Sequence, residues 1–208
     1  MSASRHNYRK LFVVEAYQYR DHLLRLDPDS RQARFSAVVS NAAVRQHVKA
    51  IDWTTTEVLG YFRDGVMRGA VEVRFASAML PASAELAFSV ERPFQGFGAG
   101  TGLMARGMMV MRNRGVTCGH IVCLLTNRRM QKMALKYRAN VKADCGEVFL
   151  TINAPHGDLS TLLAEFTDNC LGWLDIGFDI AKFYQPPLLA PFLGSGRAII
   201  EPDGCRPG

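Results

Sequence analysis

The sequence predicts an α/β (α+β) fold in which helices flank a central β-sheet. Two observations carry this prediction. Runs of alternating apolar and polar residues, typical of strands, surround Asp64–Gly65, and Asp-Gly between two such runs is a strong hairpin signal. Farther along, the strand-like run Glu85–Val90 leads into the glycine-rich turn Gln95–Thr101 and then into an apolar helix that ends at Gly115. This order places a glycine-rich loop at a helix N-terminus.

The N-terminal part is predicted to begin with a strand and to continue as helix. Leu11–Val14 is a short apolar run that we interpret as the first strand, and the spacing after it becomes helical. Asp27 and Pro28 end one helix and begin another, because proline is tolerated at a first helical position. Ser40 is a candidate N-cap for a further helix. The sequence leaves open whether this region is one broken helix or three short ones.

The next elements are strands and the helix after the glycine turn. Glu57–Phe62 and Val66–Phe75 form the arms of the hairpin, and alternation in the second arm predicts one buried face. The helix after the turn has a Met-rich stripe at core spacing, and Gly115 is predicted to cap it in the left-handed conformation. His120–Leu125 shows almost no alternation, which predicts a strand buried on both faces.

The remaining chain divides the protein at about residue 155. Asn127–Tyr137 is predicted to be helical and Glu147–Ile152 to be a strand, which completes a first domain over 1–155. Residues 156–208 are predicted to form a C-terminal helix over 159–183, followed by a tail rich in proline and glycine. Apolar residues within the tail lead us to expect that this segment packs on the domain or on a second subunit.

Composition and charge exclude several classes of protein. The 208 residues are 48% hydrophobic and 21% charged, which is ordinary for a globular protein with a sizeable core. The net charge of +6 suits an anionic small ligand as well as nucleic acid. However, the basic residues are scattered, and no RNA-binding or zinc-finger pattern is present. We therefore expect no nucleic-acid partner and no metal site.

Cysteine usage and hydropathy indicate the compartment. The cysteines are odd in number and form no Cys-x-x-Cys pair, which is typical of a reducing environment. Residues 1–10 contain no apolar segment of a signal peptide, and no apolar run is long enough to span a membrane. We expect a cytoplasmic protein without a membrane partner.

The glycine turn was tested against three phosphate-binding patterns. A dinucleotide fingerprint, Gly-x-Gly-x-x-Gly, fails because its last position falls on Thr101 or Leu103. A Walker loop fails because no lysine follows the glycines. The pattern Gln-x-x-Gly-x-Gly fits at Gln95, Gly98 and Gly100.

With the strand Ala84–Val90 before it and Asn127 after the next strand, this turn resembles the GNAT superfamily of acyl-CoA-dependent N-acetyltransferases. The resemblance extends from Leu11 to Ile152 and does not cover the C-terminal segment. It implies a mixed sheet of about six to seven strands with splayed fourth and fifth strands. It also implies acetyl-CoA or coenzyme A as cofactor and direct attack by the primary amine of a small molecule or a protein lysine.

By resemblance, the pantetheine arm pairs with the fourth strand, and the pyrophosphate lies on backbone N–H groups at the helix start, where the helix dipole favours anions. The glycines let the backbone approach the phosphates closely. Asn127 would bind the pantetheine arm, although it could also be a plain N-cap. The candidate cofactor-binding residues are Phe88, Ser89, Val90, Gln95, Gly96, Phe97, Gly98, Ala99, Gly100, Thr101, Asn127 and Met130.

The candidate catalytic residue is Glu85, at the start of the central strand. An amine must lose a proton to be acylated, and related enzymes often carry a functional glutamate in this strand. A solvated carboxylate at a strand end is the alternative. Where many family members have a tyrosine that protonates the leaving thiolate, this chain has Ala134, and Tyr137 lies nearly one turn farther on. Phe97 stands where a basic residue is common in the turn.

Two other functions remain open. A non-catalytic GNAT-like module that binds coenzyme A or a partner is compatible with Ala134 and with Arg138 and Ala139 in place of the usual Gly-Phe ending. A scaffold that oligomerises through the C-terminal segment is the other. GNAT proteins are often dimers, so the resemblance also allows a homodimer. The acceptor amine is not identified by the sequence.

Overall fold

The computed structural model describes residues 6–79, 81–153 and 157–170. The strands are β1 (His6–Lys10), β2 (Thr56–Arg63), β3 (Val66–Phe75), β4 (Ser83–Val90), β5 (Cys118–Leu124), β6 (Asn140–Asp144) and β7 (Glu147–Asn153). The helices are α1 (Ala16–Arg25), α2 (Pro28–Phe35), α3 (Asn41–Lys49), α4 (Ala99–Asn113) and α5 (Arg128–Leu135), with 3-10 turns at Val13–Glu15 and Arg92–Phe94.

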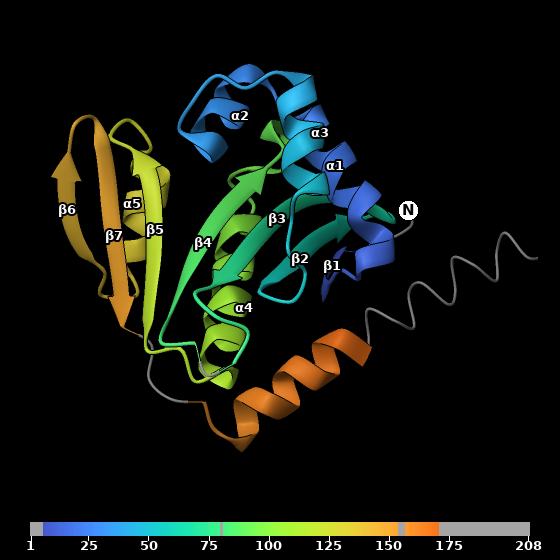
Figure 1. The fold of residues 1–208 in the computed structure, drawn as a ribbon, viewed down its shortest axis with the longest axis vertical. Helices are drawn as coiled ribbons and strands as arrows, with labels where there is room; N and C mark the ends of the chain where they lie inside the picture. The colour runs from blue at the N-terminus through green and yellow to red at the C-terminus, as the bar shows by residue number, and fades with distance from the viewer. Residues whose placement is uncertain (1–5, 80, 154–156, 171–208) are drawn as a thin grey trace, which may run out of the picture.

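The strands of the described chain form one seven-stranded sheet in the order β1-β2-β3-β4-β5-β7-β6. β4 and β5 are parallel, and every other neighbouring pair is antiparallel. The predicted mixed sheet flanked by helices is therefore confirmed. Figure 1 shows the sheet opening between β4 and β5, so that β5, β7 and β6 stand apart from the other four strands.

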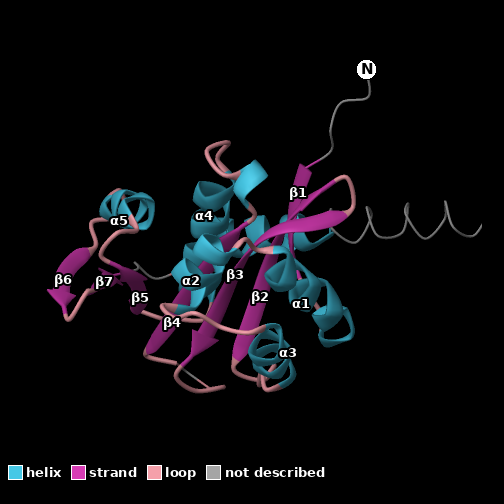
Figure 2. Cartoon of the chain, turned by 90° about the horizontal axis from the view of Figure 1, so that it is seen from above, coloured by secondary structure: helices cyan, strands magenta, loops and turns pink. Residues whose placement is uncertain are grey.

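Helices cover both faces of the larger part of the sheet (Figure 2). α4 packs against β2, β3 and β4 and buries the Met-rich stripe in one core cluster, as predicted. α1 and α3 pack together on the other face and bury a second cluster with β2 and β3. α2 contacts both β4 and β5, so it lies over the place where these strands separate. The stripe residues of α4 are Leu103, Met104, Met108 and Met111.

The first strand is a correction to the sequence prediction. β1 is His6–Lys10, which pairs with β2, whereas the predicted strand Leu11–Val14 runs into a 3-10 turn. Leu11 is buried and its N–H still donates to Val58 O (2.8 Å). The chain then turns because the Glu15 carboxylate accepts from the Phe12 N–H (3.2 Å), which leaves Val13 and Val14 exposed.

The region from α1 to α3 contains three short helices. Asp27 caps α2 by accepting from the Ser30 N–H (3.0 Å), and Pro28 is its first residue. Ser40 caps α3 by accepting from the Ala43 N–H (3.1 Å). The predicted helix boundary at Asp27–Pro28 and the predicted N-cap at Ser40 are both confirmed.

The hairpin prediction is also confirmed. β2 and β3 are joined by Asp64 (φ 52°) and Gly65 (φ 76°), the left-handed pair that a tight hairpin needs. Gly115 follows α4 with φ 72°, as expected of a left-handed cap.

β5 differs from its prediction in burial. Gly119, Ile121 and Cys123 are buried, but His120 is exposed and Val122 is only partly buried. Burial on both faces is wrong for this strand, because one side of its C-terminal half borders a cavity instead of a helix.

β6 is a strand that we did not predict from the sequence. Its five residues, NVKAD, alternate polar and apolar, but the run is short and all of its residues are exposed. It pairs with β7 through the turn Cys145–Gly146, whose φ values of 45° and 86° suit a tight hairpin.

α5 ends at Leu135, two residues before the predicted end at Tyr137.

Of the C-terminal segment, the structure describes a helix over 159–170. It contacts α4 through polar side chains: Arg106 Nε lies 2.9 Å from Asp168 Oδ2, and Asn113 Nδ2 donates to Thr161 O (3.1 Å). The predicted helix beyond 170 and the tail lie outside the described residues. No helix in the described ranges has the length and apolar character to cross a membrane.

Candidate functional site

The separation of β4 from β5 creates a large cavity. Their parallel ladder pairs Ser83 with Cys118, Ala84 with Gly119 and Glu85 with His120, and then the strands diverge. The residues after this ladder, 87–90 on β4 and 121–124 on β5, line a cavity of about 890 Å³. This volume suits a ligand the size of a nucleotide cofactor. The splayed strands expected from the resemblance are thus observed.

The start of α4 forms one end of this cavity. Gly96 (φ 87°) and Gly98 (φ 90°) take left-handed conformations that other residues rarely adopt, which turns the chain from β4 into the helix. The Gly102 N–H donates to Gly98 O (2.9 Å). The amides of residues 99–101 precede this bond, so they point out of the helix N-terminus, where the dipole favours an anion.

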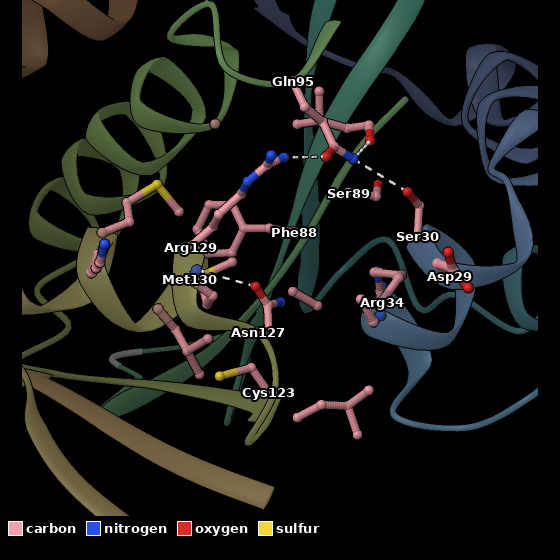
Figure 3. Close-up of a pocket in the computed structure, with 18 of the residues that line it drawn as sticks. Asp29, Ser30, Arg34, Phe88, Ser89, Gln95, Cys123, Asn127, Arg129 and Met130 are labelled. Carbon is pink, nitrogen blue, oxygen red and sulfur yellow. Dashed lines mark hydrogen bonds between the residues drawn. The ribbon is translucent and has the colours of Figure 1, made fainter. Parts of the chain in front are cut away.

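Gln95 connects three elements around the cavity (Figure 3). Its Nε2 donates to Val90 O at the end of β4 (2.9 Å) and to Ser30 Oγ of α2 (3.2 Å). Its Oε1 accepts from Arg129 Nη1 of α5 (2.6 Å). The predicted cofactor residue therefore connects the glycine turn to β4, α2 and α5.

α5 contributes positive charge to the cavity wall. Asn127 caps this helix by accepting from the Met130 N–H (3.2 Å), so the N-cap interpretation is correct and Asn127 also lines the cavity. Arg129, Lys132 and Lys136 line it as well. Their spacing of three and four residues places them on one face of the helix. Sequence reasoning missed these three cations, although this spacing was a readable signal.

Ten of the twelve predicted cofactor residues line the cavity, and two do not. Phe97 points to solvent, with 80% of its surface exposed, and Ala99 is in the core at 3%. The cavity takes its positive charge from α5, so it does not depend on a basic residue at position 97. The predicted residues that line the cavity are Phe88, Ser89, Val90, Gln95, Gly96, Gly98, Gly100, Thr101, Asn127 and Met130.

The predicted catalytic residue, Glu85, lies just before the strands separate and is not among the residues that line the cavity. Its side chain is half exposed (52%), and its Oε2 lies 3.9 Å from Arg74 Nη1. Its role as a base stays a prediction. Ala134, at the position of the usual tyrosine, is fully buried in the core, and Tyr137 packs against that core outside the cavity lining.

The opposite wall comes from α2 and rests on a buried ionic cluster. Arg34 lines the cavity, and its Nη2 donates to Glu72 Oε2 (2.8 Å) and to Tyr19 Oη (3.1 Å). His47 Nε2 lies 2.9 Å from the same carboxylate. Burial favours a higher pKa for Glu72, but the hydrogen bond from His47 and the charge of Arg34 outweigh it and lower that pKa to about 2. The cluster fixes α2 against β3.

A second buried cluster lies behind β4. His22 of α1 is fully buried, with Nε2 2.9 Å from Ser89 Oγ and Nδ1 3.2 Å from Glu91 Oε1. Ser89 also lines the cavity. Sequence reasoning assigned Ser89 a backbone role and did not find His22, because nothing local to α1 indicates that it meets β4.

The arrangement has the chemistry of a site for an extended, phosphate-bearing ligand. One end has helix amides and three cations, the middle has the unpaired edge of β4, and the wall on the α2 side carries polar groups that include Ser30 and Ser89. Amides and cations are the donors that a pyrophosphate requires. A free strand edge can pair with an amide-containing chain.

Comparison with known proteins gives a fold relationship. No protein-family model and no curated protein matches the sequence. Among solved structures, the GNAT domain of PAT from S. lividans is 22% identical with a TM-score of 0.59, over 70% of this chain and 89% of that one. An acetyltransferase of the GNAT family from Streptococcus pneumoniae is 13% identical with a TM-score of 0.56, over 71% and 97%.

A third similar structure was solved with a ligand. The PaiA N-acetyltransferase of Thermoplasma acidophilum, in complex with coenzyme A, is 14% identical with a TM-score of 0.53, over 72% of this chain and 99% of that one. At these identities the similarity shows the fold.

Proposed function

Since this chain has the GNAT fold, we propose that it is an acyl-CoA-dependent N-acyltransferase that transfers an acetyl group to a primary amine. The observation that carries the proposal is the cavity between the diverging strands β4 and β5, which ends at Gly100 and Thr101 in the first turn of α4 and at the cations of α5. The glycine turn fits neither the dinucleotide fingerprint nor the Walker loop.

The residues present fit coenzyme A at both ends of the cavity. The amides at the start of α4 and the side chains of Arg129 and Lys132 would hold the phosphates. The backbone edge of Phe88–Val90 would pair with the pantetheine arm, with an N–H group near the thioester carbonyl acting as an oxyanion donor. When bound, acetyl-CoA supplies an activated acyl group.

The protein must then hold a neutral amine beside that thioester and accept its proton. The α2 side of the cavity, with Ser30 and Arg34, is where the acceptor would lie. Glu85 is the base that the sequence singles out. No tyrosine is among the residues that line the cavity, and a thiolate is a good enough leaving group to depart without a general acid.

A binding module without catalysis is the second candidate. Ala134 is buried in the core where many family members have a catalytic tyrosine, and this observation favours it. Such a module binds coenzyme A but releases no thiol from acetyl-CoA with any amine. An enzyme binds coenzyme A and also releases thiol when the acceptor amine is present.

The cofactor is tested by thermal unfolding of the full chain with acetyl-CoA and with coenzyme A. At about a hundred times Kd, binding stabilises the folded state by about 2.7 kcal/mol, so the melting temperature rises by several degrees. Arg129→Ala should weaken binding about tenfold, because it removes a cation from the phosphate end. Arg45→Ala, on the exposed surface of α3, is the matched control. No shift at millimolar ligand would remove the cofactor from the proposal.

Catalysis is tested by following thiol release from acetyl-CoA over a panel of primary amines. The panel should include amino acids, polyamines, aminoglycosides and a lysine-containing peptide, since the structure leaves the acceptor class open. Release with at least one amine supports the enzyme. Binding of coenzyme A with no release across the panel supports the non-catalytic module.

A further inference from the structure

The buried cluster behind β4 contains three groups that can move a proton. Ser89 Oγ is 2.9 Å from His22 Nε2, and His22 Nδ1 is 3.2 Å from Glu91 Oε1. Of the three, Ser89 alone lines the cavity, while His22 and Glu91 lie behind it. Figure 3 shows Ser89 beside Ser30, on the α2 side of the cavity.

The charges around His22 determine its tautomer. Glu91 accepts from Arg25 Nε (2.9 Å) and Arg68 Nη1 (3.0 Å). Burial favours a higher pKa for Glu91, but hydrogen bonds from His22 and Arg68 outweigh it and lower that pKa, so the group is a carboxylate. A carboxylate only accepts, so His22 Nδ1 must carry the hydrogen.

The other ring nitrogen is then an acceptor. Burial lowers the pKa of His22, and the charges of Arg25 and Arg34 lower it further. Glu91 acts in the opposite direction but does not outweigh them, so the ring is neutral at pH 7. The Ser89 hydroxyl therefore donates to Nε2. This orientation directs the proton of Ser89 away from the cavity and leaves the lone pairs of Oγ to accept from a ligand.

Holding α1 against the sheet does not require the contact between His22 and Ser89. Arg25 of α1 already donates to Glu91 Oε1, just after β4, and to Met67 O of β3 (2.7 Å). A buried histidine, oriented by a carboxylate and bonded to a hydroxyl on a cavity wall, instead has the arrangement of a base that acts through that hydroxyl.

We propose that Ser89 and His22 form a proton relay that deprotonates the acceptor amine. The inference rests on the proposed N-acyltransferase function. Before the attack, the ammonium form of the acceptor passes one proton to Ser89 Oγ, and the hydroxyl proton passes to His22 Nε2. The neutral nitrogen then bonds to the acyl carbon, the C–S bond breaks, and the proton that the nitrogen still has in excess goes to the departing thiolate. The imidazolium faces the Glu91 carboxylate and returns its proton through Ser89 Oγ to the cavity, because His22 itself is fully buried. Ser89 contacts the amine, whereas His22 and Glu91 are positioning residues.

The test uses turnover against pH for Ser89→Ala, His22→Gln and Ser89→Thr. Two acceptor substrates are compared. The first is the primary amine of the panel that gives the most thiol release, and the second is hydroxylamine, which is already neutral at pH 7 and needs no deprotonation before it attacks. We expect Ser89→Ala and His22→Gln to lower kcat at pH 7 about a hundredfold with the primary amine. The loss should shrink as the pH approaches the pKa of that amine, and it should be no more than a few-fold with hydroxylamine. Ser89→Thr keeps the hydroxyl and should keep most of the activity.

Several results would overturn the relay. Ser89→Ala or His22→Gln with wild-type turnover would do so, as would an equal loss at every pH and with hydroxylamine, which indicates a structural role. A wild-type protein that gains the mass of an acetyl group on Ser89 would replace the relay with a covalent step. The acetyl-CoA melting shift separates these failures from failure of the proposed function, because the relay variants should keep the shift. Ser77→Ala, in an exposed loop, is the matched serine control.

Discussion

Glu85 and His120 form the last pair of the parallel ladder between β4 and β5, and the cavity begins two residues later, at Ala87. The divergence point therefore places Glu85 near the closed end of the cavity and Ser89 on its wall. The two residues lie on the same face of β4, since side chains alternate along a strand. They are the two candidates for accepting the proton of the acceptor amine.

Glu85→Gln distinguishes between them. If Glu85 takes the proton, this variant should lower kcat about tenfold or more, mainly at low pH, because the amide cannot act as a base. Steady-state turnover between pH 6 and 9, beside Ser89→Ala, provides the measurement. Unchanged kinetics for Glu85→Gln remove it from the mechanism and leave the Ser89 relay as the route.

Two glycines of the turn should respond differently to alanine. Gly98 has φ 90°, so alanine there is strained by about 1–2 kcal/mol and should lower both the free energy of unfolding and the affinity for coenzyme A. An added Cβ at Gly100 lies an ordinary 3.8 Å from Met133 Sδ, yet the residue lines the cavity. Gly100→Ala should therefore keep stability and lose affinity.

Denaturant unfolding and calorimetric titration with coenzyme A measure the two effects separately. Equal affinity of Gly100→Ala and wild type would mean that the phosphates do not approach this part of the helix.

Asn127 has a capping role that can be separated from cofactor binding. Asn127→Ala removes the acceptor for the Met130 N–H and should cost about 1 kcal/mol of stability. Asn127→Asp keeps the cap but removes the amide donor and adds a negative charge beside the cofactor. We expect this variant to retain its melting temperature and to bind coenzyme A about tenfold more weakly. Wild-type affinity in Asn127→Asp would show that the residue is an N-cap alone.

Glu72 should make stability depend on pH in the acid range. Its pKa is lowered from 4.5 to about 2 in the folded protein. A folded-state pKa below the unfolded one gives a stabilisation that is complete above about pH 5 and is lost as the pH falls toward 2. The shift corresponds to about 3 kcal/mol, since one pKa unit is about 1.4 kcal/mol.

Denaturant unfolding at pH 7, 5 and 3 tests this. Glu72→Gln leaves buried Arg34 without its counter-charge and should cost about 3–5 kcal/mol at pH 7. Its stability should also change less than that of wild type between pH 5 and 3. Asp144→Asn, exposed on β6, is the control. A Gln variant that loses as much free energy as wild type over this range would contradict the assignment.

The sequence by itself determined the turns and helix caps of this protein, because these features depend on local interactions. Asp64–Gly65 and Gly98 need left-handed conformations, and Asp27 and Ser40 cap helices through residues three positions away. Such signals lie within a few neighbouring residues, so they can be read without the fold. β1 and β6 were not predicted. β1 is defined by its pairing with β2, and β6 is a five-residue edge strand whose alternating residues are all exposed, so no buried face marks it.

The candidate site also combines residues that could be predicted from the sequence with residues that only the tertiary structure brings together. The glycine turn and Asn127 were readable because their spacing along the chain is regular. His22 and Ser89 are 67 positions apart, and only the packing of α1 behind β4 brings them to hydrogen-bond distance. The cavity itself is a tertiary feature, because it exists only where the β4–β5 ladder ends and the two strands diverge.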